Sequence, residues 1–265
     1  IAALLASLAE RSGAALSGLE ITVEVNPGDL DAGGLSALRE AGVNRLSIGV
    51  QSFDDERLRL LTRTHDGGRG RQAFEDARRV GFDNISCDLI CGVPGQQGDE
   101  LRREIDVMVE LAPEHVSLYG LTLSKGSALY RGGLRPLDDD RLAEHLEESA
   151  ARLGEAGYQH YEVSNYARPG RESRHNGLVW RGHPYLGLGA AAHSMVTAGA
   201  RNIRVANAPF RRYQGAGPAG GAEVAHLEGA RLMVSDAEVA QLETLMVGLR
   251  TRWGVEREAF EARFG

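Results

Sequence analysis

The chain has 265 residues, enough for one large domain or for a large and a small one, and 42% of them are hydrophobic, as in globular proteins. A formal net charge of -7 at pH 7 argues against a nucleic-acid partner, because phosphate binding usually needs clustered basic charge. No apolar run is long enough to cross a membrane, which leaves only peripheral membrane contact open. With only 2 cysteines there is no disulfide framework, so the composition favours a reducing, cytoplasmic setting.

The first half of the sequence alternates short β-branched runs with helical patterns, which is typical of βα units around a parallel sheet. The predicted strands cover residues 21–25, 44–50, 84–90, 115–121 and 158–164. Helices are predicted after Asp31, after Asp54, before Gly81, over 99–111, and from Asp138 or Asp139 to Gly154. This regular recurrence predicts an α/β fold, and it favours a full or partial (β/α) barrel over an open doubly wound sheet.

The pattern changes near residue 166, where glycine and arginine become frequent and no regular βα unit follows. We therefore expect one domain over 1–165 and a smaller α/β or α+β region over 166–265. A glycine-rich passage over 213–223 is predicted to be a mobile loop. Ser235 and Glu238 form a capping box. The helix that it opens should bury an apolar face made of Val239, Leu242, Leu245, Met246 and Leu249.

Chemistry in (β/α) barrels takes place at the carboxyl ends of the strands and on the loops that follow them. Glu24 is either a solvent-facing residue of an alternating strand or a hydrogen-bond acceptor for a cationic ligand. Gln51 can both donate and accept hydrogen bonds where such enzymes bind ligands. Asp88 lies inside an apolar strand and needs a partner or an open position there. The polar residues selected by this rule are Glu24, Asn26, Gln51, Ser52, Asp88 and Tyr119.

Two further groups of residues invite a functional interpretation but have a simpler one. Arg63 and His65 belong to a stretch that could equally be a surface turn. Cys87 and Cys91 have the spacing that begins an iron–sulfur motif, but Pro94 stands where a third cysteine would be needed. Two thiolates cannot complete a four-ligand site, so we interpret both cysteines as small core residues.

A histidine, an amide and an indole lie close together in the stretch SRHNGLVW over 173–180. They could form part of a binding site, or a loop in which the histidine satisfies backbone groups and the indole fills a seam between domains. The surrounding arginines are either a solvated loop or a clamp for carboxylates. These arginines are Arg168, Arg171, Arg174 and Arg181.

Four stretches, in this order, resemble the radical S-adenosylmethionine enzymes of the oxygen-independent coproporphyrinogen dehydrogenase group. They are EVNP, GVNRLSIGVQSFDDERLRLLTRTH, DLICGVPGQ and SLYGLT. The resemblance implies a radical SAM (β/α) barrel, here a partial one, over the first domain. It also implies that S-adenosylmethionine contacts Glu24, Gln51, Arg63 and Asp88. These residue types suit a ligand with an ammonium, a carboxylate, ribose hydroxyls and a sulfonium.

The stretch YEVSNYARPGRESRHNGLVWRGHPYLGLGAAAHS resembles the HemW subgroup of heme chaperones. The resemblance implies heme and heme-acceptor proteins as partners. It assigns heme binding to His175, Asn176 and Trp180, with His175 on the iron, although Val179 replaces the usual tyrosine of the motif. Imidazole is a common ligand of heme iron, an aromatic side chain can pack on the porphyrin, and the amide can orient the imidazole. His183 and His193 are lesser candidates for the other axial position.

Members of this group bind a 4Fe-4S cluster through a CxxxCxxC motif, and a GGTP-type stretch contacts their cofactor; neither motif is present. We therefore expect an internal fragment that cannot assemble the cluster by itself. Three functions stay open. The first is a heme chaperone that depends on S-adenosylmethionine and 4Fe-4S in the intact protein. The second is an oxygen-independent coproporphyrinogen III dehydrogenase, in which a radical abstracts hydrogen from a propionate side chain. The third is a barrel fragment without activity.

Overall fold

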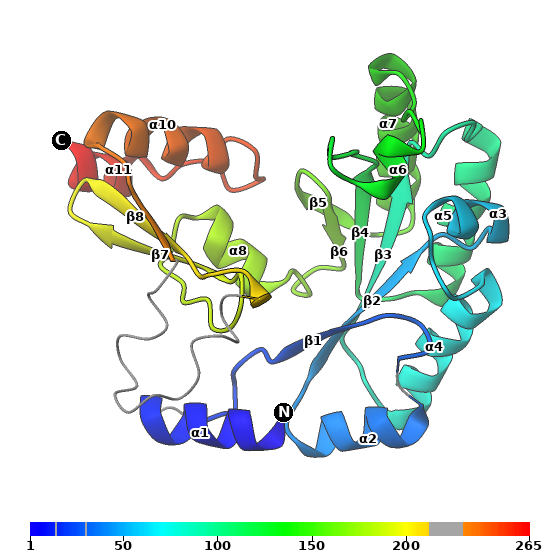
Figure 1. Ribbon diagram of the computed structural model, residues 1–265, viewed down its shortest axis with the longest axis horizontal. Coiled ribbons are helices and arrows are strands. Elements are labelled where there is room, and N and C mark those ends of the chain that lie inside the picture. Colours follow the sequence, from blue (N-terminus) through cyan, green and yellow to red (C-terminus); the bar gives the residue numbers. More distant parts are fainter. Residues whose placement is uncertain (14, 30, 212–229) are drawn as a thin grey trace. The chain divides into compact units, whose positions relative to one another are not determined.

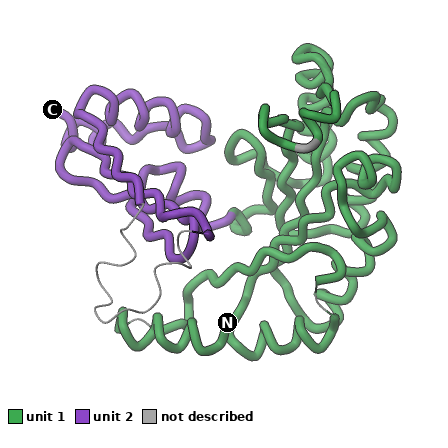
Figure 2. The backbone as a smooth tube through the Cα atoms, in the orientation of Figure 1, with its two compact units in different colours: residues 1–172 green, residues 173–265 purple. Residues whose placement is uncertain are grey.

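The computed structural model describes residues 1–13, 15–29, 31–211 and 230–265 (Figure 1). The predicted mobile loop over 213–223 lies outside these ranges. The described residues form two compact units, Ile1–Glu172 and Ser173–Gly265 (Figure 2). Within the described ranges, no helix combines the length and the apolar character needed to span a bilayer.

Unit 1 is built around a six-stranded sheet with the strand order β1-β2-β3-β4-β6-β5. Strands β1 to β4 run parallel, as the alternating pattern predicts, whereas β6 joins β4 antiparallel and forms a hairpin with β5. The strands are β1 (Thr22–Val25), β2 (Arg45–Gln51), β3 (Ile85–Cys91), β4 (His115–Gly120), β5 (Gln159–Glu162) and β6 (Asn165–Ala167). The predicted α/β class is confirmed. Because β6 pairs with this sheet, the chain leaves unit 1 later than the change in composition near residue 166.

Seven helices accompany this sheet in the described part of unit 1. They are α1 (Ala2–Ser12), α2 (Ala32–Glu40), α3 (Asp55–Leu60), α4 (Gly67–Val80), α5 (Gly98–Leu111), α6 (Ala128–Arg131) and α7 (Asp139–Glu155). The predicted cap at Asp31 is confirmed, since its carboxylate accepts a hydrogen bond from the Gly34 backbone at 2.8 Å. The predicted end at Gly154 is wrong. Helix α7 continues through it, and the left-handed turn comes at Gly157, with φ 88°.

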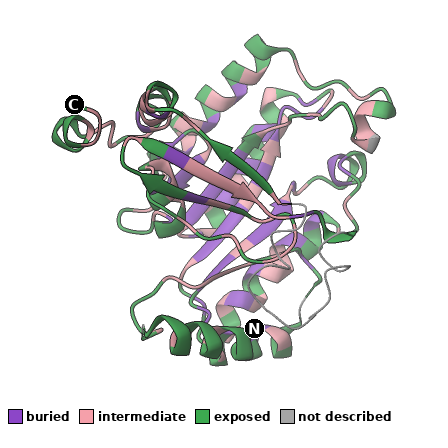
Figure 3. Cartoon of the chain, turned by 60° about the vertical axis from the view of Figure 1, so that its left-hand side comes forward, coloured by how far each residue is buried: buried purple, intermediate pink, exposed green. Residues whose placement is uncertain are grey.

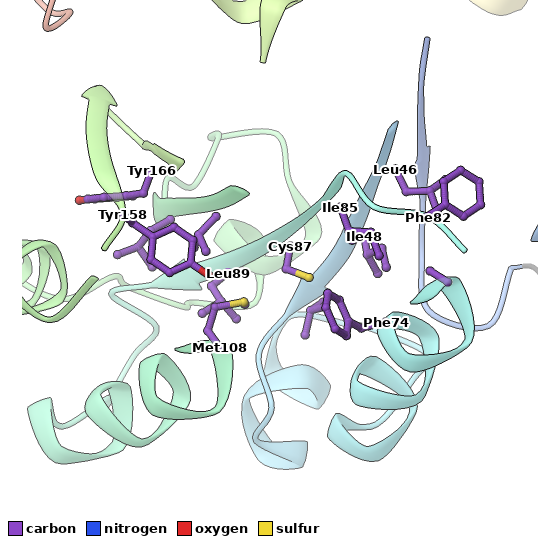
Figure 4. Close-up of a cluster of buried hydrophobic side chains, with 14 of the residues drawn as sticks. Leu46, Ile48, Phe74, Phe82, Ile85, Cys87, Leu89, Met108, Tyr158 and Tyr166 are labelled. Atoms are coloured by element: carbon purple, nitrogen blue, oxygen red, sulfur yellow. The ribbon is translucent and has the colours of Figure 1, made fainter. Parts of the chain in front are cut away.

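The core of unit 1 lies between one face of the sheet and helices α4 and α5. Alternate strand residues point to this face, among them Ile48 on β2 and Leu89 on β3, each 1% exposed. Phe74 of α4 and Met108 of α5 pack against them, as Figure 4 shows. Burying a side chain of this size contributes roughly 1.5–3 kcal/mol. This layer therefore fixes which strand residues face away from it, and those residues form the opposite face of the sheet.

Unit 2 is an α+β unit, one of the two alternatives that the sequence leaves open. Its three strands form an antiparallel sheet in the order β7-β8-β9. Its described elements are α8 (Arg174–Trp180), β7 (His193–Ala198), β8 (Arg201–Ala206), β9 (Arg231–Val234), α10 (Ala237–Gly248) and α11 (Arg257–Phe264).

Helix α10 differs from its prediction in two ways. Its cap is Asp236, whose carboxylate accepts from the Val239 backbone at 2.9 Å, and not Ser235, whose hydroxyl accepts instead from the Asn202 backbone at 3.2 Å. The apolar face is also not buried, since Leu242 is 61% and Met246 52% exposed. Buried residues concentrate instead on the strands of the unit 1 sheet (Figure 3).

Candidate functional site

The face of the unit 1 sheet that points away from α4 and α5 carries polar side chains. In the parallel register, Glu24 of β1 pairs with Ser47 of β2, and Ser47 pairs with Ser86 of β3. Asp88 of β3 pairs with Ser117 of β4. Because alternate residues of a strand share a face, these five side chains lie on one side of the sheet, called the polar face below.

Asp88 lies in the middle of the polar face. Its carboxylate accepts from the hydroxyl of Ser47 at 3.3 and 3.4 Å and from that of Ser86 at 3.5 Å. Burial raises the pKa of Asp88, the hydroxyls of Ser117 and Ser47 lower it, and the nearby negative charge of Glu24 raises it, for a net increase. The hydroxyl contacts are long, and a carboxylate offers about four lone-pair positions, so Asp88 can accept further donors from a ligand.

Gln51 ends β2 in a strained conformation. The register between β2 and β3 shifts between Ile48 and Gln51, and Gln51 has a positive φ of 66°. A Cβ at Gly49 would lie 2.7 Å from the Gln51 amide nitrogen and 3.4 Å from the Asn26 amide oxygen. Only glycine at this position leaves room for the two amides, which therefore lie together at the carboxyl end of β1 and β2.

Arg63 lies in the loop that follows α3. The imidazole of His65 is tied to this strand end, because its Nε2 lies 3.0 Å from the Val50 carbonyl oxygen. The Arg63 backbone donates to Leu58 at 2.9 Å. Its guanidinium Nε is buried without a hydrogen-bond partner among the described residues. An unsatisfied buried donor costs about 1–3 kcal/mol, so a ligand acceptor at this position would stabilise the loop.

A buried carboxylate that sequence analysis missed joins the loops after β2 and β3. Glu104 of α5 accepts from the Ser52 hydroxyl, from the Phe53 backbone at 2.8 Å and from the Gln96 amide at 3.2 Å. Gln96 in turn accepts from the Gly92 backbone at 2.8 Å. Ser52 is thus a structural residue. The signal in the sequence is an acid on the buried stripe of a helix, between Leu101 and Ile105.

A second network extends from the polar face to the start of the strands. The Ser86 hydroxyl lies 2.8 Å from His115 Nδ1, and His115 Nε2 lies 2.8 Å from the Tyr161 hydroxyl. Burial lowers the pKa of His115 well below its ordinary value, and the charge of the buried Arg45 lowers it further. The imidazole is therefore neutral and holds Ser86 in place next to Asp88.

Of the four unit 1 residues that the resemblance selects, three lie on or at the end of the polar face and the fourth lies in a nearby loop. Glu24 and Asp88 lie on the polar face, close enough for the charge of one to shift the pKa of the other. Gln51 reaches over Gly49 at the end of the same face. Arg63 belongs to a loop tied to this strand end, and its guanidinium forms no hydrogen bond or ion pair with the other three within the described residues.

The SRHNGLVW stretch forms helix α8 with Ser173 as its cap, since the Asn176 backbone donates to the Ser173 hydroxyl at 3.2 Å. Trp180 follows His175 by five positions, which turns the two side chains about 140° apart around the helix axis. His175 is exposed, whereas Trp180 is half-buried and lines a cavity of about 630 Å³ within unit 2. His175 is not among the residues that line it.

Comparison with known proteins gives a consistent result. Residues 1–108 match the family model described as Radical SAM superfamily. The chain is 35% identical over 250 residues to the heme chaperone HemW of Bacillus subtilis (strain 168), covering 93% of this chain and 64% of that protein. It is 40% identical over 181 residues to HemW of Escherichia coli (strain K12), covering 67% and 47%. The chain belongs to the radical SAM superfamily. It spans less than two thirds of the length of these relatives.

A solved structure shares the fold of this chain over 100% of this chain's length. It is coproporphyrinogen III oxidase (HemN) from Escherichia coli, with a TM-score of 0.77 and 23% sequence identity, covering 100% of this chain and 63% of that one. The predicted resemblance to the coproporphyrinogen dehydrogenase group and its barrel is confirmed. At this identity the likeness concerns the fold.

Membership in the radical SAM superfamily implies S-adenosylmethionine and a 4Fe-4S cluster, and the two fit these residues differently. The polar face offers carboxylates with spare acceptor capacity, two amides over a glycine, and an unsatisfied guanidinium nitrogen, which suits S-adenosylmethionine. The cluster needs thiolates, but Cys87 and Cys91 are each 0% exposed in the core, which confirms them as core residues. Burial raises the pKa of Cys91 to about 12. The described residues contain no cluster of three or more His, Cys, Asp or Glu side chains that could hold a metal ion.

Proposed function

We propose that this chain is the heme-binding and S-adenosylmethionine-binding portion of a cytoplasmic heme chaperone, a protein that transfers heme to acceptor proteins. One observation carries the proposal. The similarity to a protein named heme chaperone HemW covers 93% of the chain, and so includes both the polar face of unit 1 and helix α8 of unit 2. The cluster ligands of the complete protein would lie outside these residues.

In unit 1, the proposed S-adenosylmethionine contacts are Glu24, Gln51, Arg63 and Asp88. The two carboxylates accept from the ammonium group and the ribose hydroxyls, the amide of Gln51 donates and accepts, and Arg63 pairs with the ligand carboxylate. The acidic polar face also favours the positive charge of the sulfonium. When bound beside a reduced cluster, S-adenosylmethionine supplies radical chemistry in proteins of this superfamily.

In unit 2, the proposed heme contacts are His175, Asn176 and Trp180 of α8. The side chain of His175 is exposed, which suits an iron ligand that must be given up when heme passes to an acceptor. Asn176 and Trp180 are one helical turn apart and share a side of α8. His175 is the proposed ligand of iron at the surface of this helix.

Hemin titration of the chain tests the proposal. We expect a Soret band whose intensity saturates, and we expect His175→Ala to weaken binding. His160→Ala is the matched control, because it removes another exposed histidine, in unit 1. A chain that gives no Soret change with hemin would refute the proposal. Anaerobic turnover of coproporphyrinogen III by the intact protein would show that it is a dehydrogenase and not only a chaperone.

A further inference from the structure

The cavity of about 630 Å³ inside unit 2 has the size and the walls of a small-molecule site. Both tryptophans of the chain, Trp180 and Trp253, line it, together with Tyr185 and Phe260. Flat aromatic walls of this kind favour a planar, largely apolar ligand, since rings stack in offset or edge-on arrangements. The cavity is lined only by residues of unit 2.

The end of helix α8 adds a histidine to the cavity lining that includes Trp180. Gly182 takes a left-handed φ of 71°, its N–H donates to Val179 at 3.0 Å, and the N–H of His183 donates to Leu178 at 3.0 Å. This double closure is a Schellman motif, which fixes the direction of the chain after the helix. His183 thereby lines the cavity three residues after Trp180. His175 lies outside the cavity, on another side of α8.

Trp253 is held against α8 because residue 177 has no side chain. A Cβ at Gly177 would lie 3.7 Å from the edge of the Trp253 ring, already in contact, so a larger side chain would push the ring away. The guanidinium of Arg181 lies over the same ring, 4.2 Å from its centroid. Arg181 forms no ion pair with any described residue, so its charge is available to a carboxylate at the cavity.

Most of the other charged groups of the cavity are already hydrogen-bonded; Glu256, which also lines it, forms no side-chain hydrogen bond within the described residues. Arg204 donates to both oxygens of Glu243 at 2.8 and 2.9 Å, and the Asn202 amide donates to Glu243 at 2.8 Å. Arg263 donates to the Asn202 amide oxygen at 2.6 Å. This network gives the cavity a preorganised polar wall, and His183 and Arg181 are the cationic or iron-ligating groups of the lining that lie outside it.

We infer that this cavity is a porphyrin-binding site in which His183 ligates the iron and Arg181 pairs with a propionate. The inference rests on the proposed function, because it takes heme as the ligand of unit 2. It goes further in placing the macrocycle against Trp180 and Trp253, and in naming an iron ligand distinct from His175. His175, which lies outside the cavity, then gives the iron an outer position, and His183, which is also exposed but lines the cavity, gives it a second one.

The test uses hemin with the full chain and two matched variants, His183→Gly and His175→Gly. His183→Gly keeps the backbone N–H that closes α8, so the helix end persists. We expect it to change the Soret maximum and to raise the hemin Kd by at least about tenfold, because losing even a residue that only orients a metal ligand costs about that much affinity. Added imidazole should enter the vacated space and restore the spectrum. His175→Gly should weaken binding without changing the ligation spectrum of the heme that stays bound.

A second variant tests the cavity without touching a histidine. Thr197 lines the cavity and is exposed, so Thr197→Trp fills the space at little cost to folding. We expect it to reduce hemin binding as strongly as His183→Gly does, with the far-ultraviolet circular dichroism unchanged. Imidazole should not rescue it.

The outcomes separate the two proposals. Hemin binding with the same spectrum and affinity in wild type, His183→Gly and Thr197→Trp would overturn the cavity site and leave the proposed function standing. Loss of the band only in His175→Gly would do the same and would place the iron at the outer position. No hemin binding by the wild-type chain would overturn both.

Discussion

The two units bury their apolar residues very differently. In unit 1 the apolar faces of α4 and α5 meet alternate residues of β2 and β3, and Ile48, Leu89 and Met108 are almost fully enclosed. In unit 2, α10 also carries apolar residues at helical spacing, yet Leu242 is 61% and Leu249 72% exposed. Hydrophobic periodicity indicates which side chains would be buried together. It does not say whether another surface covers them.

The largest expected effect tests this difference directly. Leu89→Ala removes a side chain that is 1% exposed, and Leu242→Ala one that is 61% exposed. Because the first leaves a cavity and the second does not, we expect Leu89→Ala to lower the free energy of unfolding by about 2–5 kcal/mol. Leu242→Ala should change it by less than about 0.5 kcal/mol. Urea unfolding followed by circular dichroism measures both, and equal losses would mean that α10 is covered in solution.

A smaller effect is expected from the glycine that makes room at the polar face. Gly49→Ala brings a Cβ within 2.7 Å of the Gln51 amide nitrogen. We expect about 1–3 kcal/mol of lost stability from overpacking, together with weaker binding of S-adenosylmethionine by the intact protein. Gly126→Ala is the control, because its Cβ would meet nothing within 4 Å. Calorimetric titration measures the binding, and unaltered affinity in Gly49→Ala would remove Gln51 from the proposed site.

The neutral His115 predicts a pH dependence of unit 1. Its pKa in the folded chain lies well below the ordinary value of 6.5, so below that pH the unfolded chain binds a proton that the folded chain excludes. The stability due to His115 is therefore present above pH 6.5 and is lost as the pH falls, by at most about 1.4 kcal/mol per pH unit. The raised pKa values of Asp88 and Glu104 act in the opposite sense.

Comparison with His115→Gln isolates this contribution, because glutamine keeps a donor and an acceptor but does not titrate. We expect the difference in unfolding free energy between wild type and variant to shrink as the pH falls from about 7 to 5. A difference that stays constant over this range would show that His115 is already charged in the folded chain.

The smallest effect concerns the cap of α10. Asp236→Ala should cost about 0.5–2 kcal/mol, since its carboxylate satisfies the Val239 backbone N–H at the helix start. Asp31→Ala in unit 1 offers a matched cap, with the same contact to the third following residue. Thermal unfolding of both variants measures the two costs. A loss from Asp236→Ala as large as that from Leu89→Ala would contradict a role limited to capping.

Much of unit 1 could be predicted from the sequence because its signals are local. Apolar strand runs, the cap at Asp31 and the helix end at the left-handed Gly81 each depend on a few residues, and all are confirmed. The position of Glu24 and Asp88 on one face also follows, since the parallel register and side-chain alternation are regular. Gly49, in contrast, matters because it leaves room for the amides of Gln51 and Asn26. These amides come close to it only because the strand register shifts between Ile48 and Gln51.

The unpredicted features depend on contacts between segments distant in the chain. Glu104 looks like one more charged helix residue until the loops carrying Phe53 and Gln96 close on it. Ser235 fits a capping box in the sequence. In the structure the Asn202 backbone N–H donates to its hydroxyl, and the cap of α10 is the next residue, Asp236. Likewise, His175 and Trp180 look like one cluster in the sequence, and only their helical conformation shows that they point in different directions.

The placement of both tryptophans in unit 2 has a practical consequence for optical work on this chain. Intrinsic indole emission reports on unit 2 alone, whereas the parallel sheet contributes only tyrosine signal and far-ultraviolet ellipticity. A midpoint seen by indole emission therefore belongs to unit 2, and an ellipticity change without a matching change in emission belongs to unit 1, without any added label.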